Sequence, residues 1–87
     1  MAAYKLLIKA SAAKEIEALP TKQERQRVVS QIQSLAEHPR PVGSEKLASQ
    51  DNRYRVRQGR YRIVYEIRDR ELLVFVVKVG HRKEVYR

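Results

Sequence analysis

The sequence contains no cysteine and no tryptophan, and only three glycines and three prolines among its 87 residues. Without cysteine, the chain has no disulfide, no thiolate metal site and no cysteine nucleophile. It also has no long apolar run, because Lys5 and Lys9 interrupt the N-terminal apolar stretch, so we expect neither a signal peptide nor a membrane span. We therefore expect a cytoplasmic protein that forms a single domain over residues 1–87, a length that suffices for one small core.

Acidic residues are scarce as well. Ten Asp and Glu stand against nineteen Lys and Arg, which gives a formal net charge of +9. The cationic surplus is two over residues 1–38 and seven over residues 39–87. A surplus confined to one part of a chain indicates a basic surface, for which nucleic acid is the commonest partner, an acidic protein the next and an anionic membrane a distant third. The alternative is that the charge only keeps a small protein soluble.

The charge is concentrated between residues 52 and 67. Five arginines occupy this stretch and no acidic residue precedes Glu66, the arginines being Arg53, Arg55, Arg57, Arg60 and Arg62. On β-strands, alternation makes one face of the sheet cationic and leaves the other face apolar. A fold requires only the apolar face, and fixed positive charges repel one another unless an anion lies against them. The pattern therefore points to phosphate.

The first half of the chain reads as a strand followed by two helices. Residues 3–9 alternate with the period of a strand. Ser11 is placed as the N-cap of a helix over residues 12–19, which Pro20 ends. Thr21 is placed as the cap of a second helix from residue 22 to about 37, and the prolines of residues 38–43 predict a loop.

The second half reads as three strands. Residues 53–57 and 61–67 alternate on either side of a turn at Gly59, with the tyrosines facing the core. Residues 71–79 are almost continuously apolar, as in an interior strand covered on both faces, and Gly80 is expected to end it. The order β-α-α-β-β-β predicts an α+β fold: a mostly antiparallel, twisted sheet with a helical hairpin on one side.

These segments together resemble the RelE/ParE superfamily of bacterial toxin–antitoxin systems, in its RelE-type mRNA endonuclease branch. The resemblance is carried by Leu19-Pro20, His38-Pro39 and Lys46-Leu47, and above all by YRVRQGRYRIVYEI followed by LLVFVVKVGHRKEVYR. It implies a ribosome-dependent endoribonuclease that cleaves mRNA and so inhibits translation. It also implies an acidic antitoxin partner, in a heterodimer or heterotetramer.

The resemblance assigns roles to particular residues. The catalytic set it implies is Arg55, Arg57, Arg62, Arg82 and Tyr86. Arg55 and Arg57 stand where the best-studied form has lysines, so their role here is expected to be electrostatic, because arginine binds phosphate well but is a poor base.

Cleavage without a metal would use the ribose 2′-OH as nucleophile, which requires a proton acceptor. No metal-ligand motif is evident in the sequence, and no cofactor is expected. Tyr86 is the leading candidate for the base, because neighbouring guanidinium groups favour the phenolate. His81 is the second candidate, since imidazole titrates near neutrality. The remaining cations are expected to contact RNA without taking part in the chemistry: Arg53, Arg60, Lys83 and Arg87.

Two other functions fit the same sequence. One is a non-enzymatic inhibitor of DNA gyrase, as in the ParE branch, which generally lacks the full basic and tyrosine set. The other is a plain nucleic-acid-binding module without catalytic activity.

Overall fold

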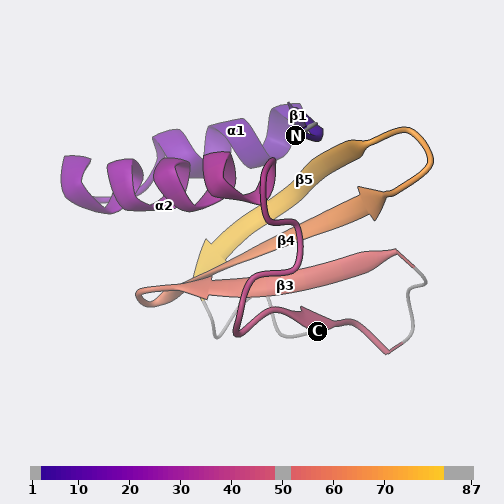
Figure 1. The fold of residues 1–87 in the computed structure, drawn as a ribbon. Helices are drawn as coiled ribbons and strands as arrows, with labels where there is room; N and C mark the ends of the chain where they lie inside the picture. The colour runs from indigo at the N-terminus through magenta and orange to yellow at the C-terminus, as the bar shows by residue number, and fades with distance from the viewer. Residues whose placement is uncertain (1–2, 49–51, 82–87) are drawn as a thin grey trace.

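The computed structural model of the chain describes residues 3–48 and 52–81. Its elements follow one another in the order β1 (Lys5–Ile8), α1 (Ala10–Glu17), α2 (Lys22–Leu35), β2 (Glu45–Lys46), β3 (Arg53–Gln58), β4 (Tyr61–Arg68) and β5 (Leu73–His81). The strands form one sheet in the order β1-β5-β4-β3-β2, and both helices lie on the same side of it (Figure 1). The predicted α+β class and the helical hairpin on one side of the sheet are confirmed.

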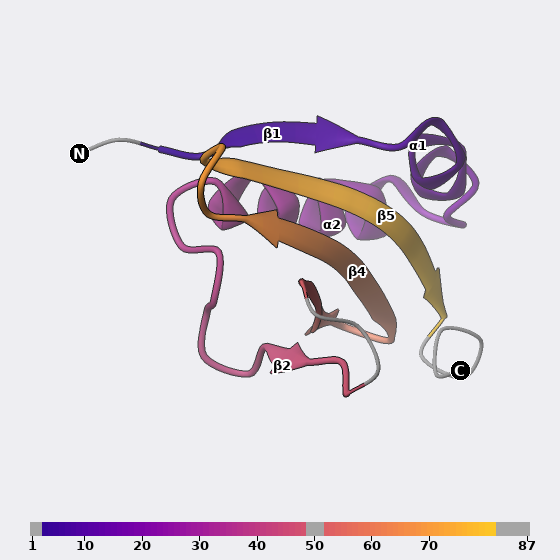
Figure 2. The same ribbon diagram turned by 90° about the vertical axis from the view of Figure 1, so that its right-hand side faces the viewer.

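The sheet is antiparallel except at one edge. The pairs β2–β3, β3–β4 and β4–β5 are antiparallel, whereas β1 pairs in parallel with β5 (Figure 2). The parallel pair joins the first strand to the last, with Lys5 opposite Leu73 and Ile8 opposite Val76. Helices α1 and α2, which follow β1 in the sequence, form the hairpin that covers one face of the sheet (Figure 1).

The core forms between the helices and one face of β3, β4 and β5. Alternate residues of β4 are buried against the helices, as the sequence predicts, namely Tyr61, Ile63, Tyr65 and Ile67. The helices contribute an apolar stripe to the same cluster: Ala12, Ile16, Val28, Ile32 and Leu35. Because side chains alternate along a strand, the arginines of β3 and β4 point to the uncovered face.

One of the two predicted helix caps is correct. The Thr21 hydroxyl accepts a hydrogen bond of 3.0 Å from the Glu24 backbone N–H, as an N-cap should. The prediction for Ser11 is wrong, since α1 begins at Ala10 with Lys9 at the N-cap position and no side-chain cap. The second helix also ends earlier than predicted, at Leu35.

The last strand differs from its prediction at both ends. It begins at Leu73 rather than residue 71, because Asp69 to Leu72 form a turn in which Leu72 has a φ of 51°. It also continues through Gly80 to His81. Its helix-side residues are buried, but Phe75 on the other face is only half-buried, so the strand is not fully covered on both faces. The two-residue strand β2 was not predicted.

No helix within residues 3–48 and 52–81 is both long enough and apolar enough to cross a membrane.

Candidate functional site

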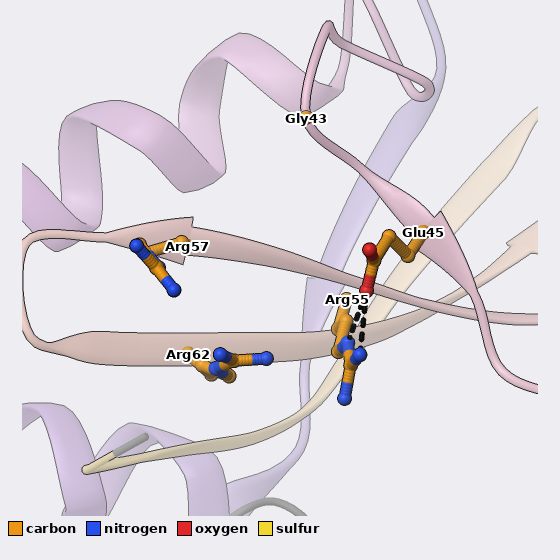
Figure 3. Close-up of a pocket in the computed structure, with 5 residues that line it drawn as sticks. All are labelled: Gly43, Glu45, Arg55, Arg57 and Arg62. Atoms are coloured by element: carbon orange, nitrogen blue, oxygen red, sulfur yellow. Dashed lines mark hydrogen bonds and ion pairs between the residues drawn. The ribbon is translucent and has the colours of Figure 1, made fainter.

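A pocket of about 310 Å³ opens on the uncovered face of the sheet. Its lining comes from the loop before β2 and from β2, β3 and β4, through Gly43, Glu45, Arg55, Arg57 and Arg62 (Figure 3). Three of these residues are arginines that the sequence singles out. The structure therefore brings Arg55, Arg57 and Arg62 together, while their roles stay predictions.

The strand register explains this convergence. Arg55 and Arg57 are two residues apart on β3 and so share a face. Arg62 lies directly opposite Arg57 on β4, so their side chains are neighbours across the hairpin (Figure 3). Arg57 is exposed, Arg55 is half-buried and Arg62 is only 7% exposed. Cationic groups thus line the pocket from its rim to its floor.

Glu45 is the residue that the sequence analysis missed. Its Oε1 accepts a hydrogen bond of 2.9 Å from Arg55 Nε and forms an ion pair with the same guanidinium (Figure 3). The hydrogen bond from Arg55 is the largest cause of a lowered pKa for Glu45, and the charges of Arg62 and Arg57 lower it further. The one signal for it in the sequence is its isolation as the single acidic residue between Glu37 and Asp51.

Two arginines of the hairpin lie outside the pocket lining. Arg53 is paired with Glu66 at 3.0 Å across the β3–β4 ladder. Arg60 is paired with Glu24 of α2 at 2.9 Å, and its guanidinium lies 5.9 Å from the centre of the Tyr61 ring. Each therefore already has a carboxylate partner, and the pocket does not include them.

His81 is placed apart from the arginine cluster. It lies opposite Tyr61 in the β4–β5 ladder, and the two rings make an edge-to-face contact with centroids 6.1 Å apart. Tyr61 belongs to the core side of β4, whereas its neighbour Arg62 faces the pocket. The structure thus does not bring His81 together with the three arginines.

The other predicted site residues, Arg82, Lys83, Tyr86 and Arg87, lie outside the described residues. In the part of the chain that the structure does describe, no three His, Asp or Glu side chains are grouped so that they could hold a metal ion. What the pocket presents is three guanidinium groups and one carboxylate. Guanidinium groups bind phosphate oxygens in a bidentate way, and a carboxylate accepts a proton. The arrangement is suited to binding a phosphodiester.

Comparison with known proteins gives two concordant results and one negative one. The family model described as ParE toxin of the type II toxin–antitoxin system parDE matches residues 6–86. Solved structures of RelE toxins match the fold over more than nine-tenths of this chain. No curated protein matches the chain.

The isolated RelE toxin of Escherichia coli is 32% identical, with a TM-score of 0.78, over 97% of this chain and 92% of that one. The intact RelBE toxin–antitoxin complex of E. coli is 30% identical, with a TM-score of 0.78, over 91% of this chain and 96% of that one. The archaeal RelE–RelB complex of Pyrococcus horikoshii is 25% identical, with a TM-score of 0.81, over 92% and 96%. The matches span nearly the whole chain. The chain therefore belongs to the RelE/ParE superfamily of type II toxin–antitoxin toxins.

Proposed function

We propose that this toxin is a ribosome-dependent endoribonuclease that cleaves mRNA at the arginine pocket and so stops translation. The observation that carries the proposal is the convergence of Arg55, Arg57 and Arg62 on one pocket of about 310 Å³. Its similarity to E. coli RelE supports the same reading.

The reaction is an attack of the ribose 2′ oxygen on the adjacent phosphorus. The bond from phosphorus to the 5′ oxygen breaks, leaving a 2′,3′-cyclic phosphate and a 5′-hydroxyl. The 2′ proton passes to a base, and an acid returns a proton to the leaving oxygen. Negative charge develops on the phosphorane oxygens, and fixed cations stabilise it best where water is excluded. Arg62, the least exposed of the three arginines, is suited to this role, with Arg55 and Arg57 holding the phosphate from the other strand.

Two residues are candidates for the base. Tyr86 remains the candidate from the family resemblance. Glu45 is the second, because it is a carboxylate that already lies in the pocket, although Arg55 lowers its pKa and so weakens it as a base. A bound phosphodiester would draw Arg55 away from Glu45 and add a negative charge beside it, and both changes raise the proton affinity of the carboxylate.

The ribosome and an antitoxin are the expected partners. With few proton-transfer groups of its own, the pocket would gain much from mRNA that the ribosome holds in a cleavable geometry. The E. coli and P. horikoshii neighbours are complexes of RelE with RelB. We infer a corresponding acidic antitoxin here, whose carboxylates would meet the cationic face of the sheet.

The test is cleavage of a defined mRNA bound to purified ribosomes, with breaks mapped by primer extension. We expect the wild-type chain to cut, and Arg57→Ala and Arg62→Ala each to lower the rate by about 10²- to 10³-fold. Arg70→Ala removes an exposed arginine from the β4–β5 turn, outside the pocket, and should retain the wild-type rate. Intact mRNA under all these conditions would refute the proposal.

To separate the two bases, we would compare Glu45→Gln with Tyr86→Phe in the same assay across pH. The variant that lacks the base should lose most of the rate and its acid-side pH dependence, whereas the other should keep the wild-type profile.

A second candidate function is inhibition of DNA gyrase, which the match to the ParE toxin model favours. A DNA supercoiling assay with purified gyrase distinguishes the two. Blocked supercoiling together with intact ribosome-bound mRNA would establish the gyrase activity, whereas unaffected gyrase with cleaved mRNA would establish the nuclease.

A further inference from the structure

One wall of the arginine pocket is a segment without helix or strand. Helix α2 ends at Leu35 and β2 begins at Glu45, and the residues between them carry Gly43 to the pocket. The residues just before β2 belong to no strand, so no ladder of backbone hydrogen bonds fixes their position. Strand β2 itself pairs with β3 through only two residues. Other contacts must hold this wall in place.

Arg40 attaches the segment to the rest of the molecule. Its guanidinium binds both carboxylate oxygens of Asp69, with Nη2 at 2.9 Å and Nη1 at 3.4 Å. Its Nε donates to the Tyr54 hydroxyl at 3.3 Å, and the guanidinium lies 5.2 Å from the centre of the Tyr54 ring. Arg40 therefore ties the loop to β3 and to the turn between β4 and β5.

Tyrosine hydroxyls hold the neighbouring atoms. The Tyr65 hydroxyl donates to the Pro39 carbonyl at 2.7 Å, and the Tyr4 hydroxyl donates to Asp69 Oδ1 at 2.6 Å. The Tyr54 and Tyr65 rings stack with centroids 6.1 Å apart. Burial raises the pKa of Tyr65 to about 12, so its hydroxyl stays protonated and able to donate at neutral pH. We call these five residues the loop clamp: Tyr4, Arg40, Tyr54, Tyr65 and Asp69.

We propose that the loop clamp positions the pocket wall, so that Glu45 meets Arg55 in the geometry that the pocket needs. The clamp residues do not line the pocket, so they are positioning residues and would act through Glu45. The role in catalysis rests on the proposed function, whereas the effect on the position of Glu45 does not.

The exposure of the Arg40–Asp69 pair argues that this part of the clamp serves positioning rather than stability. The side chains of Arg40 and Asp69 are 46% and 55% exposed, and exposed ion pairs contribute little to folding. A bidentate pair nevertheless fixes geometry in two directions. Its loss should let the wall move while the core stays folded.

The first test measures the pKa of the Glu45 carboxyl by NMR in Arg40→Ala and in a matched control. Arg68→Ala is the control, because Arg68 is 47% exposed and is also ion-paired, with Glu66 two residues away, but holds no part of the wall. We expect Arg40→Ala to move the pKa of Glu45 up toward its ordinary value of about 4.3, because Arg55 no longer holds the carboxylate. Arg68→Ala should leave it unchanged. An equal pKa of Glu45 in the two variants would overturn the proposal.

Tyr65→Phe provides a second test that keeps the core ring and removes only the hydroxyl. It should raise the pKa of Glu45 in the same direction as Arg40→Ala, and Arg40→Lys should restore part of the wild-type value by keeping the charge at that point. If Tyr65→Phe leaves the pKa of Glu45 at its wild-type value, the hydrogen bond from Tyr65 to Pro39 does not position the wall, and that part of the proposal is overturned.

The kinetic consequence is measured on ribosome-bound mRNA. We expect Arg40→Ala to lower kcat by about tenfold or more with KM little changed, since a misplacement of 1 Å can cost about 100-fold. Arg68→Ala loses the same charge and should keep kcat. If the wild-type chain does not cleave, the proposed function fails, but the titration of Glu45 still decides whether the clamp positions the wall.

Discussion

At the scale of single residues, Arg62 is unusual because it is a buried cation between two residues of the apolar core. It stands between Tyr61 and Ile63, which pack in the core, and its own side chain is 7% exposed in a pocket with two other arginines. Within residues 3–48 and 52–81 it is the one charged side chain in the buried class. Burying a cation beside like charges opposes folding, so we expect Arg62 to lower the stability of the fold.

Replacement of this cation by an apolar side chain of similar length should separate the two effects. We expect Arg62→Met to leave the free energy of unfolding unchanged or to raise it by about 1 kcal/mol, while lowering the rate of cleavage as much as Arg62→Ala does. Chemical denaturation and the mRNA assay measure the two quantities. A loss of about 3 kcal/mol or more would instead mean that the cation is required by the fold.

Asp69 makes folding sensitive to acid. The hydrogen bond from Arg40, and then that from Tyr4, lower the pKa of the Asp69 carboxyl. A carboxyl whose pKa is lower in the folded state adds stability above its unfolded pKa of about 3.9, and this stability is lost as the pH falls through the folded value.

We therefore expect Asp69→Asn to flatten the acid side of the stability curve. Because the Arg40–Asp69 pair is exposed, the unfolding temperature of the wild type should exceed that of the variant only slightly at neutral pH, and this small difference should shrink as the pH falls below about 4. Glu71→Gln removes an exposed carboxylate from the same turn and is the control. If the curves of unfolding temperature against pH run parallel for the wild type and Asp69→Asn, the Asp69 carboxylate does not contribute to stability through its lowered pKa.

At the scale of elements, the two helix starts show what a cap contributes. The Thr21 hydroxyl accepts from the Glu24 N–H at 3.0 Å, which caps the start of α2, and it donates to the Glu24 carboxylate at 3.2 Å. Ser11 lies inside α1 and makes no cap.

We expect Thr21→Ala to lower the free energy of unfolding by about 1 kcal/mol, because the Glu24 N–H loses its acceptor. Ser11→Ala should change it by no more than about 0.5 kcal/mol, toward higher stability, since alanine has the better helix propensity. Urea denaturation of both variants gives the comparison. Equal effects would show that the cap geometry is not what stabilises α2.

Periodicity explains why most elements were predictable. Along β4, Tyr61, Ile63, Tyr65 and Ile67 pack in the core whereas Arg62 faces the pocket, so the two faces of the strand and the convergence of Arg55, Arg57 and Arg62 follow from the alternation in the sequence. Strand β2 has only two residues, too few for any period, and Glu45 was missed with it. The parallel pairing of β1 with β5 depends on contacts nearly seventy residues apart, which no local pattern contains.

At the scale of the whole molecule, the net charge of +9 is partly neutralised in place. Arg53, Arg55 and Arg60 each have a carboxylate partner in the fold. Binding of RNA releases counterions in proportion to the phosphates neutralised, so cations that already have a carboxylate partner should contribute less to the salt dependence of binding.

Arg57→Ala and Arg53→Ala test this difference. On a non-cleavable RNA, we expect Arg57→Ala to reduce the slope of log affinity against log salt by about 0.7, the value for one contact to a single strand. Arg53→Ala should reduce it less, because Glu66 already neutralises Arg53. Fluorescence anisotropy over a salt series measures both slopes, and equal reductions would contradict this picture.

The position of β5 determines when the sheet can form during synthesis. This strand lies between β1 and β4 and buries Val74, Val76 and Val79, so β1 has no partner in the sheet until β5 has been made. A nascent chain that lacks β5 holds β1 and the hairpin apart, with their apolar faces unpaired. A nascent chain would thus have to be extended through β5 before the sheet could close and the arginine pocket could rest on a folded core.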